Sequence, residues 1–210
     1  MSKRLVIVMW CAVPLAGLAQ TEAPLDLTEK LRFHVDRTFG PLALLGDAAY
    51  AGALQGIGTP NEWRRGAEGY GMRFASTAGW SVIDNAIAFG LTATLHQDPR
   101  YFRSAEGGFW RRTGHALRGT ILTRTDRGAE TLSTWRLGSD YGSAFLSNQW
   151  YPDRLNTVKL GFIEGSVTMG FDLARNLAAE FWPDIRRKAF HRNSAHRDAG
   201  GSLSVGIPAK

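Results

Sequence analysis

Three aspartates lie inside segments that are otherwise apolar or rich in small residues: Asp84, Asp140 and Asp172. An unpaired carboxylate is costly to bury, so each needs either a cation or a polar cleft beside it. Arg73 and Arg136 are the candidate partners if the aspartates form salt bridges between helices. The alternative is a ligand-binding role, in which the three aspartates and Arg73 line a polar site.

His96 and Asp98 could bring an imidazole and a carboxylate together in one loop, as a hydrolase or a metal site requires. His115 would join them if the chain were an enzyme. The structural alternative for His96 is a cation at a helix C-terminus. The sequence contains no His-Glu-x-x-His pattern, nucleophile elbow, P-loop or dinucleotide fingerprint. We therefore expect no metal and no cofactor, and the sequence names no reaction.

Trp110, Arg111 and Arg112 place an indole beside two guanidinium groups. Tryptophan favours sites with one apolar and one wet side, and arginine clusters attract anionic surfaces. We expect several tryptophans to share an exposed surface with these arginines and with Arg64 and Arg65; an ordinary solvated surface is the alternative. No nucleic-acid motif is present, so no nucleic-acid partner is expected.

Helical periodicity predicts the elements that carry these residues. Asp26 and Glu29 form a capping box that opens a helix to about Arg37. Its apolar residues share one face: Leu27, Leu31, Val35 and Phe39. Five further helices are predicted: 42–54, 63–95, 108–122, 135–149 and 156–181. In the last of them, Gly161 and Gly165 form a small-residue step that lets another helix approach closely.

A strand interpretation competes over residues 70–74 and 167–173, where apolar and polar residues alternate as in a small outer-membrane protein. The alternation is too short for a membrane strand of roughly 10 residues and does not recur regularly. We therefore predict an all-α, single-domain bundle of five or six helices over residues 20–192, with small-residue-rich helix contacts. Residues 193–210 are predicted to be a disordered polar tail.

The first 19 residues predict where the protein acts. Lys3 and Arg4 precede an apolar run from Leu5 to Leu15, and Gly17-Leu18-Ala19 supplies a cleavage site. We expect residues 1–19 to be a cleaved signal peptide, which would remove Cys11, the one cysteine of the 210-residue chain. The expected location is the periplasm or the outer membrane's surface. The net charge of +6 suits an anionic partner.

Five runs of residues resemble those of an uncharacterised exported protein family from acidobacteria: Asn61-Glu62-Trp63, Gly69-Tyr70-Gly71-Met72-Arg73, Asp98-Pro99-Arg100-Tyr101-Phe102, Tyr151-Pro152-Asp153-Arg154 and Glu180-Phe181-Trp182-Pro183-Asp184-Ile185. The resemblance covers most of the chain after the signal. It implies export to the cell envelope and brings no catalytic residues with it.

We therefore expect an exported cell-envelope protein with a binding or structural role, acting through an aromatic and basic surface. Its partner would be an anionic membrane surface or another envelope component. The alternatives are a periplasmic hydrolase centred on His96 and Asp98, and a small outer-membrane protein.

Overall fold

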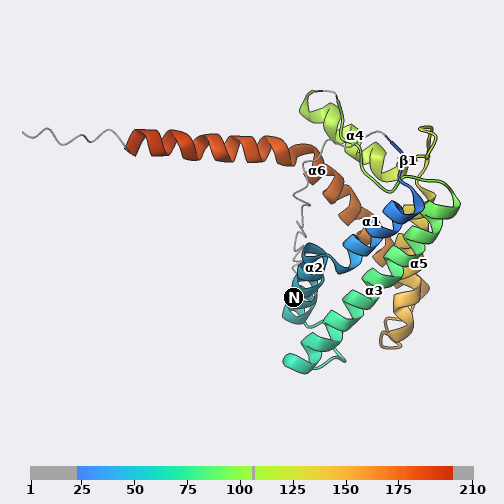
Figure 1. The fold of residues 1–210 in the computed structure, drawn as a ribbon. Helices are drawn as coiled ribbons and strands as arrows, with labels where there is room; N and C mark the ends of the chain where they lie inside the picture. The colour runs from blue at the N-terminus through green and yellow to red at the C-terminus, as the bar shows by residue number, and fades with distance from the viewer. Residues whose placement is uncertain (1–22, 106, 201–210) are drawn as a thin grey trace, which may run out of the picture.

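The computed structural model describes residues 23–105 and 107–200, with side chains described as far as Arg187. The predicted signal peptide lies outside these residues. Within them the chain forms six α-helices, a short 3-10 helix and a two-stranded hairpin (Figure 1). The elements are α1 (Leu27–Phe39), α2 (Pro41–Ile57), α3 (Ala67–Thr94), α4 (Phe109–Ile121), β1 (Leu122–Arg124), β2 (Glu130–Leu132), α5 (Thr134–Ser147), η1 (Asn148–Trp150) and α6 (Val158–Gly200). The all-α prediction is confirmed, and both alternating segments lie in helices.

The helix α3 is the centre of the bundle, since α1, α2 and α5 all pack against it and α6 packs against α5. The capping box of α1 forms as predicted: Glu29 N–H donates to the Asp26 side chain, and the Glu29 carboxylate accepts from the Asp26 N–H. Pro41 occupies the first turn of α2, where a missing N–H does no harm.

The hairpin β1–β2 is a feature that the sequence pattern did not predict. Its strands are antiparallel, with Leu122 opposite Leu132. The hairpin holds the segment that follows α3, because Asp98 N–H donates to the Arg124 carbonyl and Thr123 Oγ1 donates to the Asp98 carbonyl. Asp98, in the segment after α3, is thereby fixed against β1.

The helix α6 does not end at Phe181, as predicted, but continues through Pro183 to Gly200. It includes residues 193–200 of the expected polar tail, and residues 201–210 lie outside the described residues. Proline removes one helical hydrogen bond and commonly kinks a helix without ending it. Figure 1 shows α6 turning as it leaves the body of the molecule.

The predicted small-residue step brings α5 and α6 together within one chain. A Cβ on Gly161 would lie 2.5 Å from the ring of Phe145, and a Cβ on Gly165 would lie 2.4 Å from the ring of Tyr141. Both approaches are closer than real side chains allow. The glycines therefore let two aromatic rings of α5 lie against the backbone of α6.

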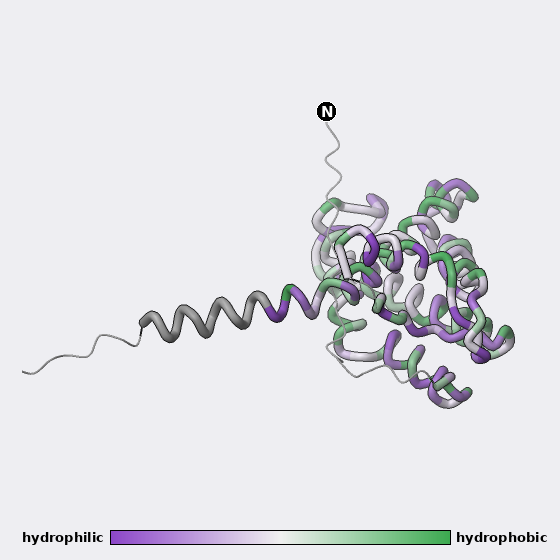
Figure 2. Tube along the Cα trace, turned by 90° about the horizontal axis from the view of Figure 1, so that it is seen from above, coloured by the Kyte–Doolittle hydropathy of each residue, from purple (hydrophilic) through white to green (hydrophobic). Residues whose placement is uncertain are grey.

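The inward faces of the helices are polar rather than apolar. Most of the buried residues of α3 have hydroxyl, amide or charged side chains: Arg73, Ser76, Thr77, Ser81, Asp84, Asn85 and Thr92. In α6 the buried Asp172, Asn176 and Glu180 follow at a spacing of four residues. Figure 2 shows hydrophilic and hydrophobic residues following each other along the same helices.

The expected inward face of α1 is the exposed one. Leu27 and Phe39, at its two ends, are 62% and 59% exposed, and Leu31 and Val35 between them are also exposed. The stripe beside it, about 80° around the helix at 3.6 residues per turn, is buried: Lys30, His34 and Thr38. The periodicity predicted the helix correctly, but its polar face contacts α3 because α3 presents polar partners.

Among the described helices, none combines the length and apolarity that crossing a membrane requires.

Candidate functional site

The aspartate cluster (Asp84, Asp140 and Asp172) lies where α5 packs against α3 and α6, and side chains of α5 contact the carboxylates of the other two helices. Asp172 is the member with cation partners: Arg136 Nε donates to its Oδ2 at 2.7 Å. Arg175 and Arg37 form further ion pairs with Asp172, at 2.9 and 3.5 Å. The predicted interhelical pairing with Arg136 is therefore present.

Among the residues that the structure describes, no cation forms an ion pair with Asp140 or Asp84. Burial, followed by the charges of Asp172 and Asp84, raises the pKa of Asp140 far above its usual range. Burial and the charge of Asp172 raise the pKa of Asp84 to about 6. The Oδ2 of Asp140 is buried without a hydrogen-bond partner, while Ser143 Oγ donates to Asp84 at 3.2 Å. The ion pairs of the cluster are thus concentrated on Asp172, while burial favours the protonated form of Asp140.

This cluster is not a metal centre. Within the described residues, no three His, Cys, Asp or Glu side chains are arranged to hold a metal ion. Arg136 also donates to the carbonyls of Gly119 and Thr120 at the end of α4. The arrangement ties α4, α5 and α6 together and has the properties of a structural network.

Arg73, also a candidate binding residue, is completely buried and has another role. Its guanidinium donates to the carbonyls of Thr59, Pro60, Trp63, Arg64 and Gly69 and to the side chain of Gln55. A guanidinium has five N–H donors, so a single side chain organises the whole loop between α2 and α3. It does not contribute to the aspartate cluster.

His96 and Asp98 have different partners. His96 is well exposed and lies 3.5 Å from Asp126. Asp98 is buried and accepts hydrogen bonds from the backbone and guanidinium of Arg100. The carboxylate therefore neutralises an arginine instead of orienting an imidazole, and the geometry does not assemble the proposed hydrolase pair.

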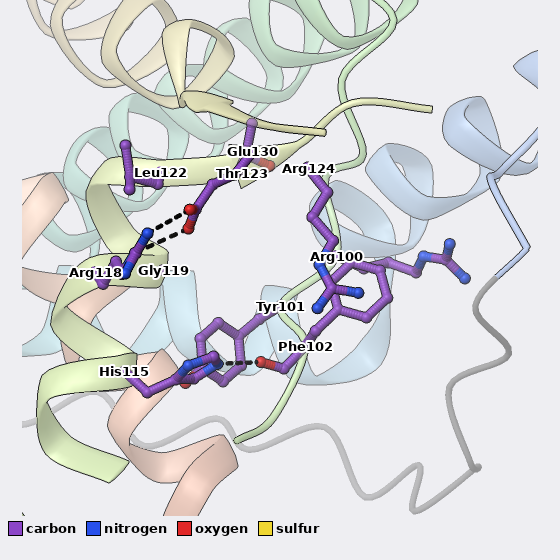
Figure 3. A pocket seen from close by; sticks show the side chains of 10 residues that line it. All are labelled: Arg100, Tyr101, Phe102, His115, Arg118, Gly119, Leu122, Thr123, Arg124 and Glu130. Carbon is purple, nitrogen blue, oxygen red and sulfur yellow. Dashed lines mark hydrogen bonds and ion pairs between the residues drawn. The ribbon is translucent and has the colours of Figure 1, made fainter. Parts of the chain in front are cut away.

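His115 lies on α4, with its Nε2 2.8 Å from the carbonyl oxygen of Phe102. A carbonyl can only accept, so Nε2 carries a proton. His115 lines a pocket of about 80 Å³ between α4, the hairpin and the loop after α3 (Figure 3). We call it the arginine pocket; its lining residues are Arg100, Tyr101, Phe102, His115, Arg118, Gly119, Leu122, Thr123, Arg124 and Glu130.

The expected shared surface of tryptophans and arginines is not formed. Trp63 and Trp135 are buried, whereas Trp110 is 81% exposed. Arg64 and Arg65 precede α3 and the pair at 111–112 lies in α4, towards the opposite end of α3 (Figure 1).

Arg112 is held inward by ion pairs with Glu180 and Asp184, and its guanidinium stacks over Phe181. Trp110 and Arg111 remain on the surface.

A smaller surface takes its place, the α4 face, formed by Trp110, Leu117 and Ile121. These residues lie within about 40° of one another around the helix at 3.6 residues per turn, and all are exposed. Arg111 and Arg118 lie about 80–100° to one side. An apolar stripe with tryptophan and flanking arginines is typical of helices that lie in a membrane interface.

Two buried groups escaped the sequence analysis. Glu180 is fully buried and accepts from Tyr101 Oη, Ser104 N–H and Arg112 Nε. Lys30 donates to Asp126 and to the Thr92 carbonyl. Each belongs to a stripe of polar residues four apart, on α6 and α1 respectively. The four-residue spacing could have indicated a buried polar stripe in the sequence. Polar residues that face solvent on a helix have the same spacing, so it does not distinguish the two.

Comparison of the chain with protein-family models, with curated proteins and with solved structures finds no match. The function has to be argued from the geometry alone.

Proposed function

We propose that this is an exported cell-envelope protein that binds a membrane surface in a non-enzymatic, structural or binding role. The observation that carries the proposal is the inverted polarity of the bundle: ion pairs and hydroxyl groups lie inside while large apolar side chains face outward. Exposing apolar area to water is unfavourable by about 25 cal/mol per Å². Lipid removes this penalty.

The spread of the exposed apolar residues favours lipid over a single protein partner. They occur on α1, α2, α4 and α6, for example Leu31, Leu45, Trp110 and Phe162. One docked protein covers one face, whereas a lipid phase conforms to several. Ion pairs such as that of Arg136 with Asp172 lie inside, and pairing of this kind is what charged groups need where the surroundings cannot solvate them.

The α4 face is the part of this surface that best fits the lipid headgroup region. Trp110 supplies an interfacial aromatic ring, and Leu117 and Ile121 extend the apolar stripe along the same side. Arg111 and Arg118 flank it and suit anionic headgroups. This face retains the aromatic and basic character expected from the sequence, on a single helix.

Co-sedimentation of the full chain, as the cell processes it, with phosphatidylcholine vesicles containing or lacking phosphatidylglycerol tests the proposal. We expect pelleting at low salt that increases with the anionic lipid. The double substitution Trp110→Ser/Leu117→Ser should weaken partitioning about tenfold or more, since a buried apolar side chain contributes about 1.5–3 kcal/mol.

Val158→Ser is the control, because Val158 is also exposed but begins α6, about 27 Å along that helix from Asn176, which contacts α4. Far-ultraviolet circular dichroism verifies the fold of each variant. A protein that stays in the supernatant with anionic vesicles at low salt overturns the membrane role. An equal loss in Val158→Ser overturns a contact centred on α4.

A further inference from the structure

The arginine pocket contains an excess of positive charge and one arginine without a carboxylate. Three arginines and one glutamate line it. Arg118 donates from Nε to Glu130 at 3.0 Å and pairs with it through Nη2. Arg100 pairs with Asp98 behind the pocket. Arg124 forms no ion pair and donates no side-chain hydrogen bond within the part of the chain that the structure describes.

Arg124 is nevertheless held in place. Its guanidinium lies 4.6 Å from the centroid of the Phe102 ring, and a cation over an aromatic face is attracted to it. Figure 3 shows the side chain descending from the hairpin to this ring, on the side of the pocket, while Arg100 points away. The stacking thus holds the Arg124 guanidinium at the pocket, and its N–H groups donate to no other described residue.

The walls of the pocket are fixed by contacts from three elements. Tyr101 packs against Gly119 so closely that a Cβ there would lie 2.7 Å from its ring, and its hydroxyl donates to Glu180. His115 is anchored on the Phe102 carbonyl. The pocket volume of about 80 Å³ is several times the roughly 10–15 Å³ that one water needs. It has room for a tetrahedral anion.

We propose that the arginine pocket binds a phosphate group, with the Arg124 guanidinium as its principal ligand and the Nη1 N–H groups of Arg118 as the second. Guanidinium matches phosphate oxygens in a fork of two parallel hydrogen bonds. The pocket shares Arg118 with the flank of the α4 face, although its other α4 residues, His115 and Gly119, lie farther around the helix. A lipid phosphate and a free phosphate offer the same chemistry, and only the choice of a lipid source rests on the proposed function.

The test uses the full chain as the cell processes it, with inorganic phosphate as the probe in isothermal titration calorimetry against chloride at equal ionic strength. We expect phosphate binding that Arg124→Gln weakens about tenfold, in line with about 1.5–3 kcal/mol for hydrogen bonds to charged groups. Arg127→Gln is the matched control: Arg127 is exposed in the turn of the same hairpin and does not line the pocket. The affinity of Arg127→Gln for phosphate should stay within about twofold of that of the native chain, as expected for a substitution at the surface.

A second arm identifies the source. Vesicles of phosphatidylcholine with phosphatidic acid should be bound less well by Arg124→Gln if the phosphate is a lipid headgroup. Unchanged vesicle binding together with weakened phosphate binding assigns the pocket to free phosphate. Equal phosphate binding by the native chain and Arg124→Gln, or no binding beyond that of chloride, overturns the site. Failure of all vesicle binding overturns only the membrane role.

Discussion

Two regions of buried carboxylates along α6 differ in how their oxygens obtain hydrogen-bond donors. The Glu180 node, formed by Glu180 with Tyr101, Ser104 and Arg112, surrounds its carboxylate with three donors. The aspartate cluster concentrates its donors on one member and leaves Asp140 with a buried oxygen that has no partner. Equally buried carboxylates can therefore differ in how many donors they receive.

The difference has a physical origin in how each region gathers its partners. The loop after α3 supplies a backbone N–H and a hydroxyl to Glu180, whereas the aspartate cluster is enclosed by regular helices whose N–H groups are already used. Only side chains can serve the aspartates, and the arginines reach Asp172. A loop backbone can therefore donate an N–H group to a buried carboxylate. A helix backbone cannot, because its N–H groups already donate within the helix.

Removing the cation of the aspartate cluster should have the largest effect. Arg136→Ala leaves Asp172 and two carbonyls of α4 without their donor, which we expect to lower the free energy of unfolding by about 3–5 kcal/mol. Urea unfolding followed by circular dichroism measures it. Arg37→Ala, which removes a longer and partly exposed pair with the same Asp172, should cost under about 1 kcal/mol. Equal costs would contradict Arg136 as the main partner.

Neutralising Glu180 should rank second. Glu180→Gln keeps the shape but replaces one acceptor oxygen with an amide NH2 donor and removes the carboxylate that faces Arg112. We expect a loss of about 1.5–3 kcal/mol in the free energy of unfolding, the range for hydrogen bonds to charged groups. Glu130→Gln, at an exposed pair, should change it by under about 1 kcal/mol. A negligible cost at Glu180 would remove the contrast between the two regions.

Asp140→Asn should have the smallest effect at neutral pH and the opposite sign. Asp140 has its pKa raised from the usual 3.8 by burial first and then by the charges of Asp172 and Asp84. Above about pH 4 the folded state keeps a proton that the unfolded state releases, so the free energy of unfolding falls as pH rises. An amide at this position titrates in neither state, so the variant should be equally or more stable at neutral pH.

The measurement is the unfolding midpoint of the native chain and of Asp140→Asn between pH 4 and 8. We expect a shallower decline with rising pH in the variant. Asp36→Asn, at an exposed position of α1, controls for the loss of one carboxylate from the chain. An unchanged slope in Asp140→Asn would show that Asp140 is ionised when folded.

His34 makes the free energy of unfolding depend on pH in the opposite direction. Burial lowers its pKa to about 4, so its contribution to stability is lost on acidification below about pH 6.5.

The sequence by itself determined the helices and some of their ends. The capping box at Asp26 and Glu29 and the glycines at 161 and 165 act through neighbours in sequence or through a backbone that any packed helix needs, so they were readable. Periodicity also located Asp84, Asp140 and Asp172 as buried polar groups and Arg136 as a partner.

Only the tertiary structure decided which face of each helix lies inside. A stripe with a period of 3.6 residues separates the two faces but does not say which contacts the neighbouring helix, and here the polar stripes meet each other. The donors around Glu180 and the stacking of Arg124 on Phe102 depend on a loop, a helix and a hairpin that packing brings together over long sequence separations. Those contacts follow from packing, which local spacing does not encode.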